Sequence, residues 1–388
     1  MLYKTNYIDF SEWNEYSSSS INGLARLINI NNYEIAAFTR EYMYSSSSSS
    51  SSSSYHIKRQ IKIYNKYNDK WRILTENWVN SSNLGRILLF TFNQYTKEFQ
   101  ISSRITKIQN YKPEKYNIIT FKTIDLNQNI KTELKCNVTK INGNIGGMFC
   151  DDKNRVHVIV DDQQYIWNIA NSNIQMGMQH LQNIFYDCYH DGSDSAYTRF
   201  ILVPSKKVIL IIGAYDHKKK WCNTFRPFGI WKYCLITNKC IELGFAFEYS
   251  ITSCALTIDE KYVIIAGEQS HNNNADIFIL DMTSNEYKLY KSQIKLPLFG
   301  ICNYWMNMII IGGPIDEILI NGWIKKLFKT KEFEHLSLPP TYLIRMISQW
   351  LDQCMLHVFY SQPEYNRPWT IHSKHYEIRL SQILDSIY

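Results

Sequence analysis

Residues 249–313 read YSITSCALTIDEKYVIIAGEQSHNNNADIFILDMTSNEYKLYKSQIKLPLFGICNYWMNMIIIGG, and this stretch decides the fold. An opening segment, 249–255, is followed by 261–267, a short apolar run that ends in glycine. A polar loop then leads to 276–281, where polar and apolar residues alternate, and to a return segment at 286–290. Short apolar or alternating runs between turn residues are typical of β-strands. The stretch therefore predicts four short strands in succession.

The same order begins again after one unit of about 45 residues, where 307–313 repeats the apolar run of 261–267 with a pair of glycines at its end. Four short strands that recur at this period are typical of one blade of a β-propeller. A chain of 388 residues is long enough for a ring of six or seven blades. Its 14% aromatic content also favours strands over helices. The predicted fold class is all-β.

The unit resembles a kelch repeat, in which an apolar run and a glycine pair precede a polar loop, an aromatic strand, a turn and an aromatic return strand. The resemblance covers residues 25–336 and is strongest from 200 to 313. Complete glycine pairs occur at 146–147 and 312–313, and the pairs at 213–214 and 267–268 are eroded. WD40 repeats are the competing family, but their Gly-His and Trp-Asp signatures are missing here. The resemblance implies a propeller of kelch-like, four-stranded blades.

We expect three regions. Residues 1–20 form a polar N-terminal segment, 21–336 form the propeller, and 337–388 form a C-terminal amphipathic helix with two closing strands at 355–360 and 375–380. The serine tract at 45–54 is expected to be a disordered loop between the second and third strands of the first blade. The sixth blade is expected to start at residue 300 and to close with a hairpin of 322–328 and 332–336. The helix begins at Pro340 and also has a faint likeness to an F-box helix.

Charge and cysteine content bound the partners and the compartment. The 42 basic and 35 acidic residues give a net charge of +7, spread along the sequence rather than concentrated in one arm, so we expect no nucleic-acid partner. The nine cysteines show no zinc-ligand spacing and are expected to be buried, reduced thiols. No apolar run approaches the 18 residues of a membrane span, and no signal peptide opens the chain. The expected location is cytoplasmic, without membrane contact.

Motifs of catalysis are scarce. The ten histidines are scattered, and no P-loop, dinucleotide fingerprint or nucleophile elbow is present. The one compact group of metal-ligand types is Asp187, His190, Asp191 and Asp194, which reads equally as a solvated turn. We therefore expect no enzyme activity, no cofactor and no metal.

The leading hypothesis is a non-catalytic propeller that binds a protein partner as a scaffold or adaptor, because a rigid ring leaves its loops free for recognition. The candidate contact loops are 187–197, 215–228 and 268–274. The candidate contact residues, chosen for the side chains that dominate protein interfaces, are Tyr197, Lys219, Trp221, Phe225 and Arg226. Two alternatives remain: a metal-dependent propeller oxidase or hydrolase, and a substrate adaptor of a ubiquitin ligase.

Overall fold

The structure is a computed structural model of all 388 residues. It describes residues 14–16, 24–45, 54–66, 70–76, 86–93, 97–108, 115–125, 130–138, 145–151, 153, 155–160, 163–168, 173–176, 184–185, 199–216, 228–237, 239–247, 250–268, 274–297, 305–312, 354–364 and 367–387.

The described strands pair into six antiparallel sheets, which we number I to VI. Sheet I contains β2 (Leu24–Asn29), β3 (Glu34–Ser45), β4 (Ser54–Asn65) and β5 (Lys70–Glu76). Sheet II contains β6 (Arg86–Asn93), β7 (Glu98–Ile108), β8 (Lys115–Asp125) and β9 (Ile130–Val138). Sheet III contains β10 (Ile145–Cys150), β11 (Arg155–Val160), β12 (Gln163–Asn168) and β13 (Asn173–Met176).

Sheet IV has five strands. Two of them, β14 (Ile184–Phe185) and β15 (Arg199–Val203), both pair with β16 (Val208–Asp216). The sheet then continues with β17 (Phe228–Cys234) and β18 (Cys240–Phe247). Sheet V contains β19 (Ser250–Leu256), β20 (Tyr262–Glu268), β21 (Asn274–Asp281) and β22 (Lys288–Pro297). Sheet VI contains β23 (Trp305–Ile311), β24 (Met355–Glu364), β25 (Arg367–Arg379) and β1 (Asn14–Tyr16).

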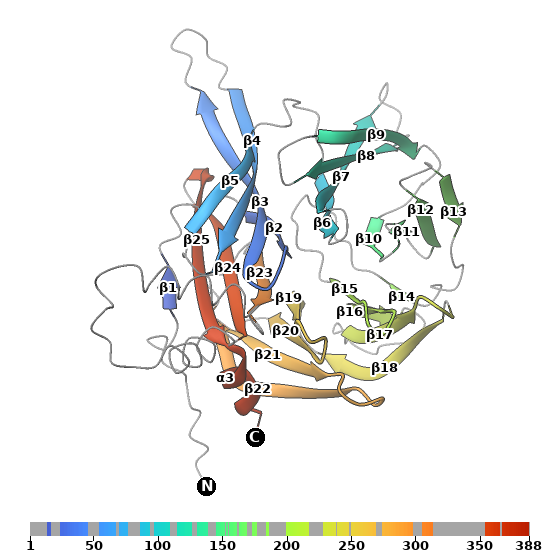
Figure 1. The fold of residues 1–388 in the computed structure, drawn as a ribbon, viewed down its shortest axis with the longest axis vertical. Coiled ribbons are helices and arrows are strands. Elements are labelled where there is room, and N and C mark those ends of the chain that lie inside the picture. The colour runs from blue at the N-terminus through green and yellow to red at the C-terminus, as the bar shows by residue number, and fades with distance from the viewer. Residues whose placement is uncertain are drawn as a thin grey trace, which may run out of the picture.

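The six sheets form a ring around a shared axis. Their innermost strands contact one another in the cyclic order β2, β6, β10, β15, β19, β23 and back to β2. Figure 1 shows these six strands nearest the middle and the later strands of each sheet farther out. The protein is therefore an all-β propeller, as the sequence predicts, and its described strands make six sheets.

Two local features recur from sheet to sheet. In sheets I, II, III and V the first strand carries a β-bulge near its start, which increases twist and bends the strand. In sheets I, III and V a polar side chain opens the turn to the second strand and accepts hydrogen bonds from two backbone N–H groups beyond it. These side chains are Asn31, Asp151 and Thr257. Short polar side chains that bond their own backbone are the usual means of fixing a turn.

Sheet VI joins the two ends of the described chain. β1 pairs antiparallel with β25, so that Asn14 lies opposite Glu377 and Tyr16 lies opposite His375. The N-terminal segment, expected only as a polar stretch, thus supplies the outermost strand of the last sheet. This strand closes the ring.

The composition of the sixth sheet differs from the sequence-based assignment. Residues 307–313 were expected to repeat the second-strand position of 261–267, but β23 is the innermost strand of its sheet and β24 is the second. The prediction was wrong because an apolar run with glycine fits either position once both faces of the strand are buried. Sheet VI also extends past residue 336, the expected end of the ring. The expected hairpin at 322–328 and 332–336 lies outside the described residues.

The expected C-terminal helix lies outside the described residues from 340 to 353, and its last apolar position, Val358, belongs to strand β24. A short helix, α3 (Leu380–Asp385), follows β25. In the sequence, the serine tract lies between the second and third strands of sheet I. Its end residues, Ser45 and Ser54, pair across β3 and β4, and residues 46–53 are not among those described.

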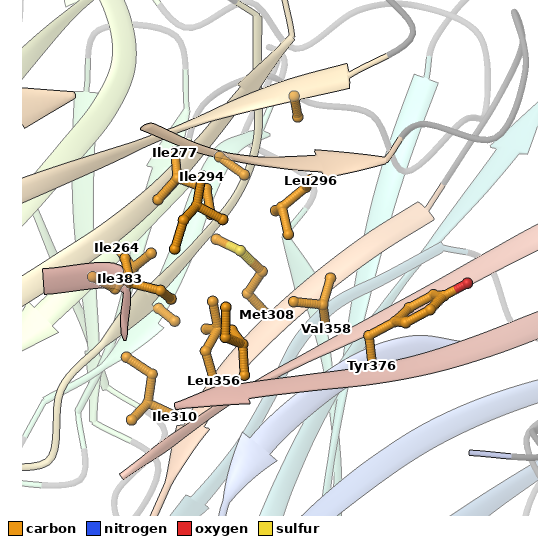
Figure 2. Packing of buried hydrophobic residues seen from close by; sticks show 14 of the residues in the cluster. Ile264, Ile277, Ile294, Leu296, Met308, Ile310, Leu356, Val358, Tyr376 and Ile383 are labelled. Carbon is orange, nitrogen blue, oxygen red and sulfur yellow. The ribbon is translucent and has the colours of Figure 1, made fainter. Parts of the chain in front are cut away.

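The core lies between neighbouring sheets rather than at the axis. Figure 2 shows the largest cluster, in which Ile264, Ile277 and Ile294 of sheet V meet Leu356 and Val358 of sheet VI. Ile383 of α3 covers the same cluster, so the C-terminal helix caps the junction of these two sheets. In the part of the chain that the structure describes, no helix has the length and apolar composition needed to cross a membrane.

Candidate partner-binding face

All five predicted contact residues lie outside the described residues: Tyr197, Lys219, Trp221, Phe225 and Arg226. The same holds for the Asp187, His190, Asp191 and Asp194 group. Within the described ranges, no three or more His, Cys, Asp or Glu side chains gather as a metal site would require. These predictions stay predictions, and the described residues point to a different part of the ring.

The most extended feature is a two-stranded ribbon on sheet I. β3 and β4 pair without interruption from Glu34 and Asn65 to Ser45 and Ser54. The neighbouring strands stop earlier, because β2 pairs with β3 only as far as Thr39 and β5 pairs with β4 only as far as Gln60. Residues 40–45 and 54–59 therefore continue beyond the four-stranded sheet, and Figure 1 shows them as the long projection at the top of the view. We call this segment the sheet I ribbon.

Similar but smaller extensions occur on the two sheets that flank sheet I. In sheet II, β7 and β8 remain paired through residues 105–108 and 115–116, beyond the last pairs made by β6 and β9. In sheet VI, β24 and β25 remain paired beyond the last residues paired with β23 and β1. All three extensions connect a second strand to a third strand, so the repeated topology places them at the same end of the ring. Sheets VI, I and II thus present three neighbouring hairpins on one face.

The register defines the two faces of the sheet I ribbon. Directly opposed residues of an antiparallel pair share a face, and alternate residues along a strand lie on opposite faces. Closer to the axis, Ala36 and Phe38 of β3 and Ile61 and Ile63 of β4 belong to the cluster packed against sheet II. Continuing that alternation along β3 and β4, which pair without a register shift, assigns six ribbon residues to the face on the sheet II side. They are Arg40, Tyr42, Tyr44, Tyr55, Ile57 and Arg59.

The opposite face of the ribbon has a different composition. Its six positions are Glu41, Met43, Ser45, Ser54, His56 and Lys58. Here Glu41 is directly opposite Lys58, an arrangement of opposite charges. On the sheet II side, Arg40 is directly opposite Arg59, an arrangement of like charges. Like charges in directly opposed positions of a sheet are destabilising in general.

The extension of sheet II, residues 105–108 and 115–116, which we call the sheet II hairpin, has a similar set of residues. Phe99 and Ile101 of β7 and Ile124 of β8 pack toward sheet I, whose Phe38 lies against Phe90 of β6 with ring centroids 5.7 Å apart. The same alternation places Ile105, Lys107 and Tyr116 on the face toward sheet I. By register alone, these nine positions of sheets I and II comprise two arginines, one lysine, four tyrosines and two isoleucines.

Sequence reasoning missed this face. The grouping of these residues depends on strand register and on which sheets are neighbours, and neither is contained in a single segment of the sequence. A signal was available in the alternation of Arg40, Tyr42 and Tyr44, but its partner strand begins only after the serine tract.

The buried ionisable groups of the described residues have roles in the framework. Asp151 Oδ2 accepts hydrogen bonds from Arg155 Nε (2.8 Å) and His157 Nε2 (3.0 Å). The amide of Gln164 donates to His157 Nδ1 (2.8 Å), and the hydroxyl of Tyr233 donates to Gln164 Oε1 (2.9 Å). Burial alone would raise the pKa of Asp151, but the hydrogen bonds from His157 and Arg155 outweigh it and hold the pKa well below its usual range. Because Tyr233 belongs to sheet IV, this network joins sheets III and IV.

A second buried group lies where sheet VI meets sheet I. His357 on β24 and His375 on β25 are stacked side by side, with the ring of Tyr64 from sheet I edge-on to both. Trp71 of sheet I packs edge-on against Phe359 of sheet VI, with ring centroids 5.9 Å apart. This aromatic cluster holds the junction at which the ring closes.

The described thiols differ in how readily they ionise. Burial raises the pKa of Cys240 and of Cys254 to about 12, so both are protonated at neutral pH. The pKa of Cys234 is lowered by hydrogen bonds from Thr237 in a turn. No disulfide is formed by the described cysteines, four of which are free: Cys234, Cys240, Cys254 and Cys354.

The glycine pairs do not occupy the positions that a kelch repeat would give them. Gly146 and Gly147 lie inside β10, the innermost strand of sheet III, and Gly312 follows β23, the innermost strand of sheet VI. Gly213 and Gly267 do lie toward the ends of second strands, and Gly213 has a φ of 89°, a backbone conformation that favours glycine. The propeller fold is shown by the structure, and the kelch type is not.

Comparisons with known proteins identify no family for this chain. No family model and no curated protein matches the chain. Among solved structures, it is similar to the β-propeller domain of the Trilobed protease from Pyrococcus furiosus, with 11% identity over 95% of this chain and 98% of that chain and a TM-score of 0.39. A putative 6-phosphogluconolactonase from Bacteroides fragilis matches with 11% identity over 73% and 86% of the two chains and a TM-score of 0.42. The Dos1 propeller matches with 10% identity over 73% and 65% and a TM-score of 0.37.

Proposed function

We propose that this propeller is a protein-binding scaffold or adaptor, and that the hairpins of sheets VI, I and II form its binding face. The observation that carries the proposal is the sheet I ribbon, twelve residues that continue past the ring in paired strands while the rest of sheet I ends. Because these residues pair beyond the four-stranded part of sheet I, their strands are placed to contact a partner outside the ring.

The composition of the ribbon supports the same function. Tyrosine and arginine are enriched at the energetically dominant positions of protein interfaces, because they bring a large contact area at a small cost in side-chain freedom. The twelve residues of the ribbon, 40–45 and 54–59, include three tyrosines and two arginines. The framework that carries it is held by cores between sheets and by buried polar networks, so the face can change its partner without a change in fold.

The proposal is tested by capturing partners of the full chain in the cells that make it, with identification by cross-linking and mass spectrometry. A ribbon-shortened variant replaces residues 41–58 with Asn-Gly, a two-residue hairpin turn between Arg40 and Arg59. A control variant replaces only 46–53 with the same turn, which removes the serine tract and keeps every described ribbon pair. We expect a stoichiometric protein partner that survives the control and is lost with the shortened ribbon. A partner that binds both variants equally would remove the ribbon from the interface.

A further inference from the structure

Two lysines of sheet IV converge on one tyrosine of sheet V. Lys206, in the turn between β15 and β16, and Lys232, on β17, hold their Nζ atoms 5.4 Å and 5.2 Å from the centroid of the Tyr287 ring. The Lys206 ammonium also donates a hydrogen bond to the carbonyl oxygen of Met282. In the part of the chain that the structure describes, neither ammonium forms an ion pair with a carboxylate. Two like charges therefore meet at one ring with neutral partners.

An exposed apolar side chain lies beside these cations. Ile241 on β18 is directly opposite Lys232, so both lie on the face of sheet IV that is turned toward Tyr287 of sheet V. Ile241 is 47% exposed and is one of three exposed large hydrophobic side chains among the described residues. We call the resulting surface the IV–V rim. Its members are Lys206, Lys232, Ile241 and Tyr287.

The IV–V rim is supported by the core between sheets IV and V. Tyr287 and Leu289 from the outer part of sheet V, and Leu243 and Phe245 of β18, pack against the buried cluster that contains Phe278. β18 and β22 are the outermost strands of their neighbouring sheets (Figure 1). The rim thus lies on the outside of the ring, where a partner can reach it, and its side chains are carried by packed strands.

The geometry points to a partner of one kind: we infer that an acidic protein segment binds the IV–V rim, with a carboxylate shared by Lys206 and Lys232 and an adjacent apolar side chain on Ile241. The face of an aromatic ring and a carbonyl oxygen attract an ammonium group only modestly, whereas a carboxylate forms charge-assisted hydrogen bonds with it. This surface belongs to sheets IV and V and is separate from the sheet I ribbon, so the inference goes beyond the proposed binding face and adds a second site.

The form of β18 indicates how the segment binds. The pairing of β18 with β17 is interrupted by a bulge at residues 243–245, where Gly244 has a φ of 76°. A bulge bends an edge strand and breaks the regular row of backbone groups that a further strand would need. The partner therefore contacts the rim through its side chains rather than as an added strand of sheet IV.

The same face favours a protein over a nucleic acid. A phosphate backbone is bound by a row of cations, commonly about six to ten contacts. The next lysines along this side of sheet V, Lys291 and Lys295, already pair with the buried carboxylate of Asp276, at 2.7 Å and 3.6 Å. Two available ammonium groups beside an exposed isoleucine suit a carboxylate that is followed by an apolar side chain.

The experiment selects random peptides of about eight residues, roughly 26 Å in extended form, on the purified full chain and measures their affinity by fluorescence anisotropy. We expect peptides in which Asp or Glu stands next to an aliphatic or aromatic residue. The double variant Lys206→Ala, Lys232→Ala should weaken binding about tenfold or more, and Ile241→Ser about threefold. Lys232→Arg, which keeps the charge, should stay within about threefold of the original affinity.

The matched control is Lys288→Ala. This lysine is exposed, follows Tyr287 in the sequence and lies opposite Asp281, on the other face of sheet V from Leu289. Its removal should change the affinity less than about twofold. Thermal melts of each variant check that the ring is intact, and the Lys232→Arg variant tests the charge without removing a side chain.

Three results would overturn the inference. They are recovery of no peptide or of peptides without acidic enrichment, an equal loss of affinity in the Lys288→Ala variant and the double lysine variant, and displacement of the peptides by a single-stranded oligonucleotide of similar length. The ribbon-shortened variant separates this inference from the proposed function. It should bind the selected peptides with unchanged affinity, and loss of their binding in that variant would place them on the ribbon instead of the rim.

Discussion

His357 Nδ1 lies 2.9 Å from His375 Nε2, and both rings are buried where the last sheet of the ring meets the first. Burial lowers the pKa of His357 well below 6.5, an effect that the neighbouring His375 strengthens. Burial also lowers the pKa of His375 to about 3. The pair is therefore neutral at physiological pH and shares one hydrogen bond between two imidazole rings.

This pair predicts that acid weakens the closed ring. In the unfolded chain these histidines bind protons with a pKa near 6.5, whereas in the folded chain their pKa values are lower. The free energy of unfolding is therefore not reduced by this pair above pH 6.5, and it decreases as the pH drops from 6.5 toward about 3. Two groups contact the pair: Glu377, whose Oε2 lies 3.6 Å from His357 Nδ1, and the ring of Tyr64. The positive charge of Lys66 also opposes protonation of His357. We expect the urea concentration at the unfolding midpoint to decrease as the pH is lowered from about 7 to about 5.

The control for this prediction is the double variant His357→Gln, His375→Gln. It should be less stable at neutral pH, because it loses aromatic packing against Tyr64, and its stability should depend less on pH in the same window. An unchanged pH slope in the double variant would show that other groups cause the acid sensitivity.

Asp151 is expected to be the most sensitive single position at the junction of sheets III and IV. Asp151→Ala removes the acceptor for both Arg155 and His157 and leaves a buried imidazole N–H without its partner. Breaking a buried charged pair in this way costs about 3–5 kcal/mol, measurable by urea denaturation. Asp259→Ala is the comparison, since that carboxylate is half exposed and pairs with the exposed Lys261; it should cost less than about 1 kcal/mol. Similar losses for the two variants would contradict the structural role of the network.

Lys97, the residue before β7, has a left-handed backbone conformation with a φ of 56°. A β-branched residue tolerates this region poorly, whereas asparagine and glycine accept it readily. We expect Lys97→Val to lower the free energy of unfolding by about 1–2 kcal/mol and Lys97→Asn to be neutral or slightly stabilising. Thermal melts of both variants check the prediction. Because Lys97 is exposed, a loss of packing cannot explain a difference between them.

Closure by β1 predicts a specific effect of truncation. Removing residues 1–18 takes away the strand paired with His375, Tyr376 and Glu377 and exposes the outer edge of β25. The truncated chain should melt at a lower temperature and tend to associate, because an open strand edge pairs with other chains. Hydrogen exchange should accelerate at 375–377 and remain slow in β20, which lies in the interior of sheet V. Unchanged protection at 375–377 would mean that β1 does not hold this edge.

Much of the ring could be predicted from local patterns. The apolar runs at 208–212 and 261–266 correspond to β16 and β20, because buried strands require those residues whatever their neighbours are. A strand is also found at 276–281, but the expected alternation is wrong, since residues 275–280 of β21 are all buried. The position of a strand within its sheet could not be predicted in the same way. Met306 to Ile311 has the composition of a second strand and is an innermost one, since both positions bury two faces.

The candidate binding face required information that no single segment contains. That Arg40 opposes Arg59 depends on the register across the serine tract, and that both lie on the face toward Lys107 depends on the packing of sheet I against sheet II. The pairing of three N-terminal residues with β25, some 360 positions later, has no local signature either. Such long-range relationships come from the closure of the ring, which the individual repeats do not specify.

The shared sheet at the closure has a consequence for biosynthesis. Its outer strand leaves the ribosome first and its other three strands leave last, so five sheets can assemble while the circle is still open. During that interval the hydrophobic flank of sheet I that later covers Phe359 faces solvent. A nascent chain stalled before residue 355 would therefore be a target for chaperones, and synthesis of β24 and β25 would complete the ring.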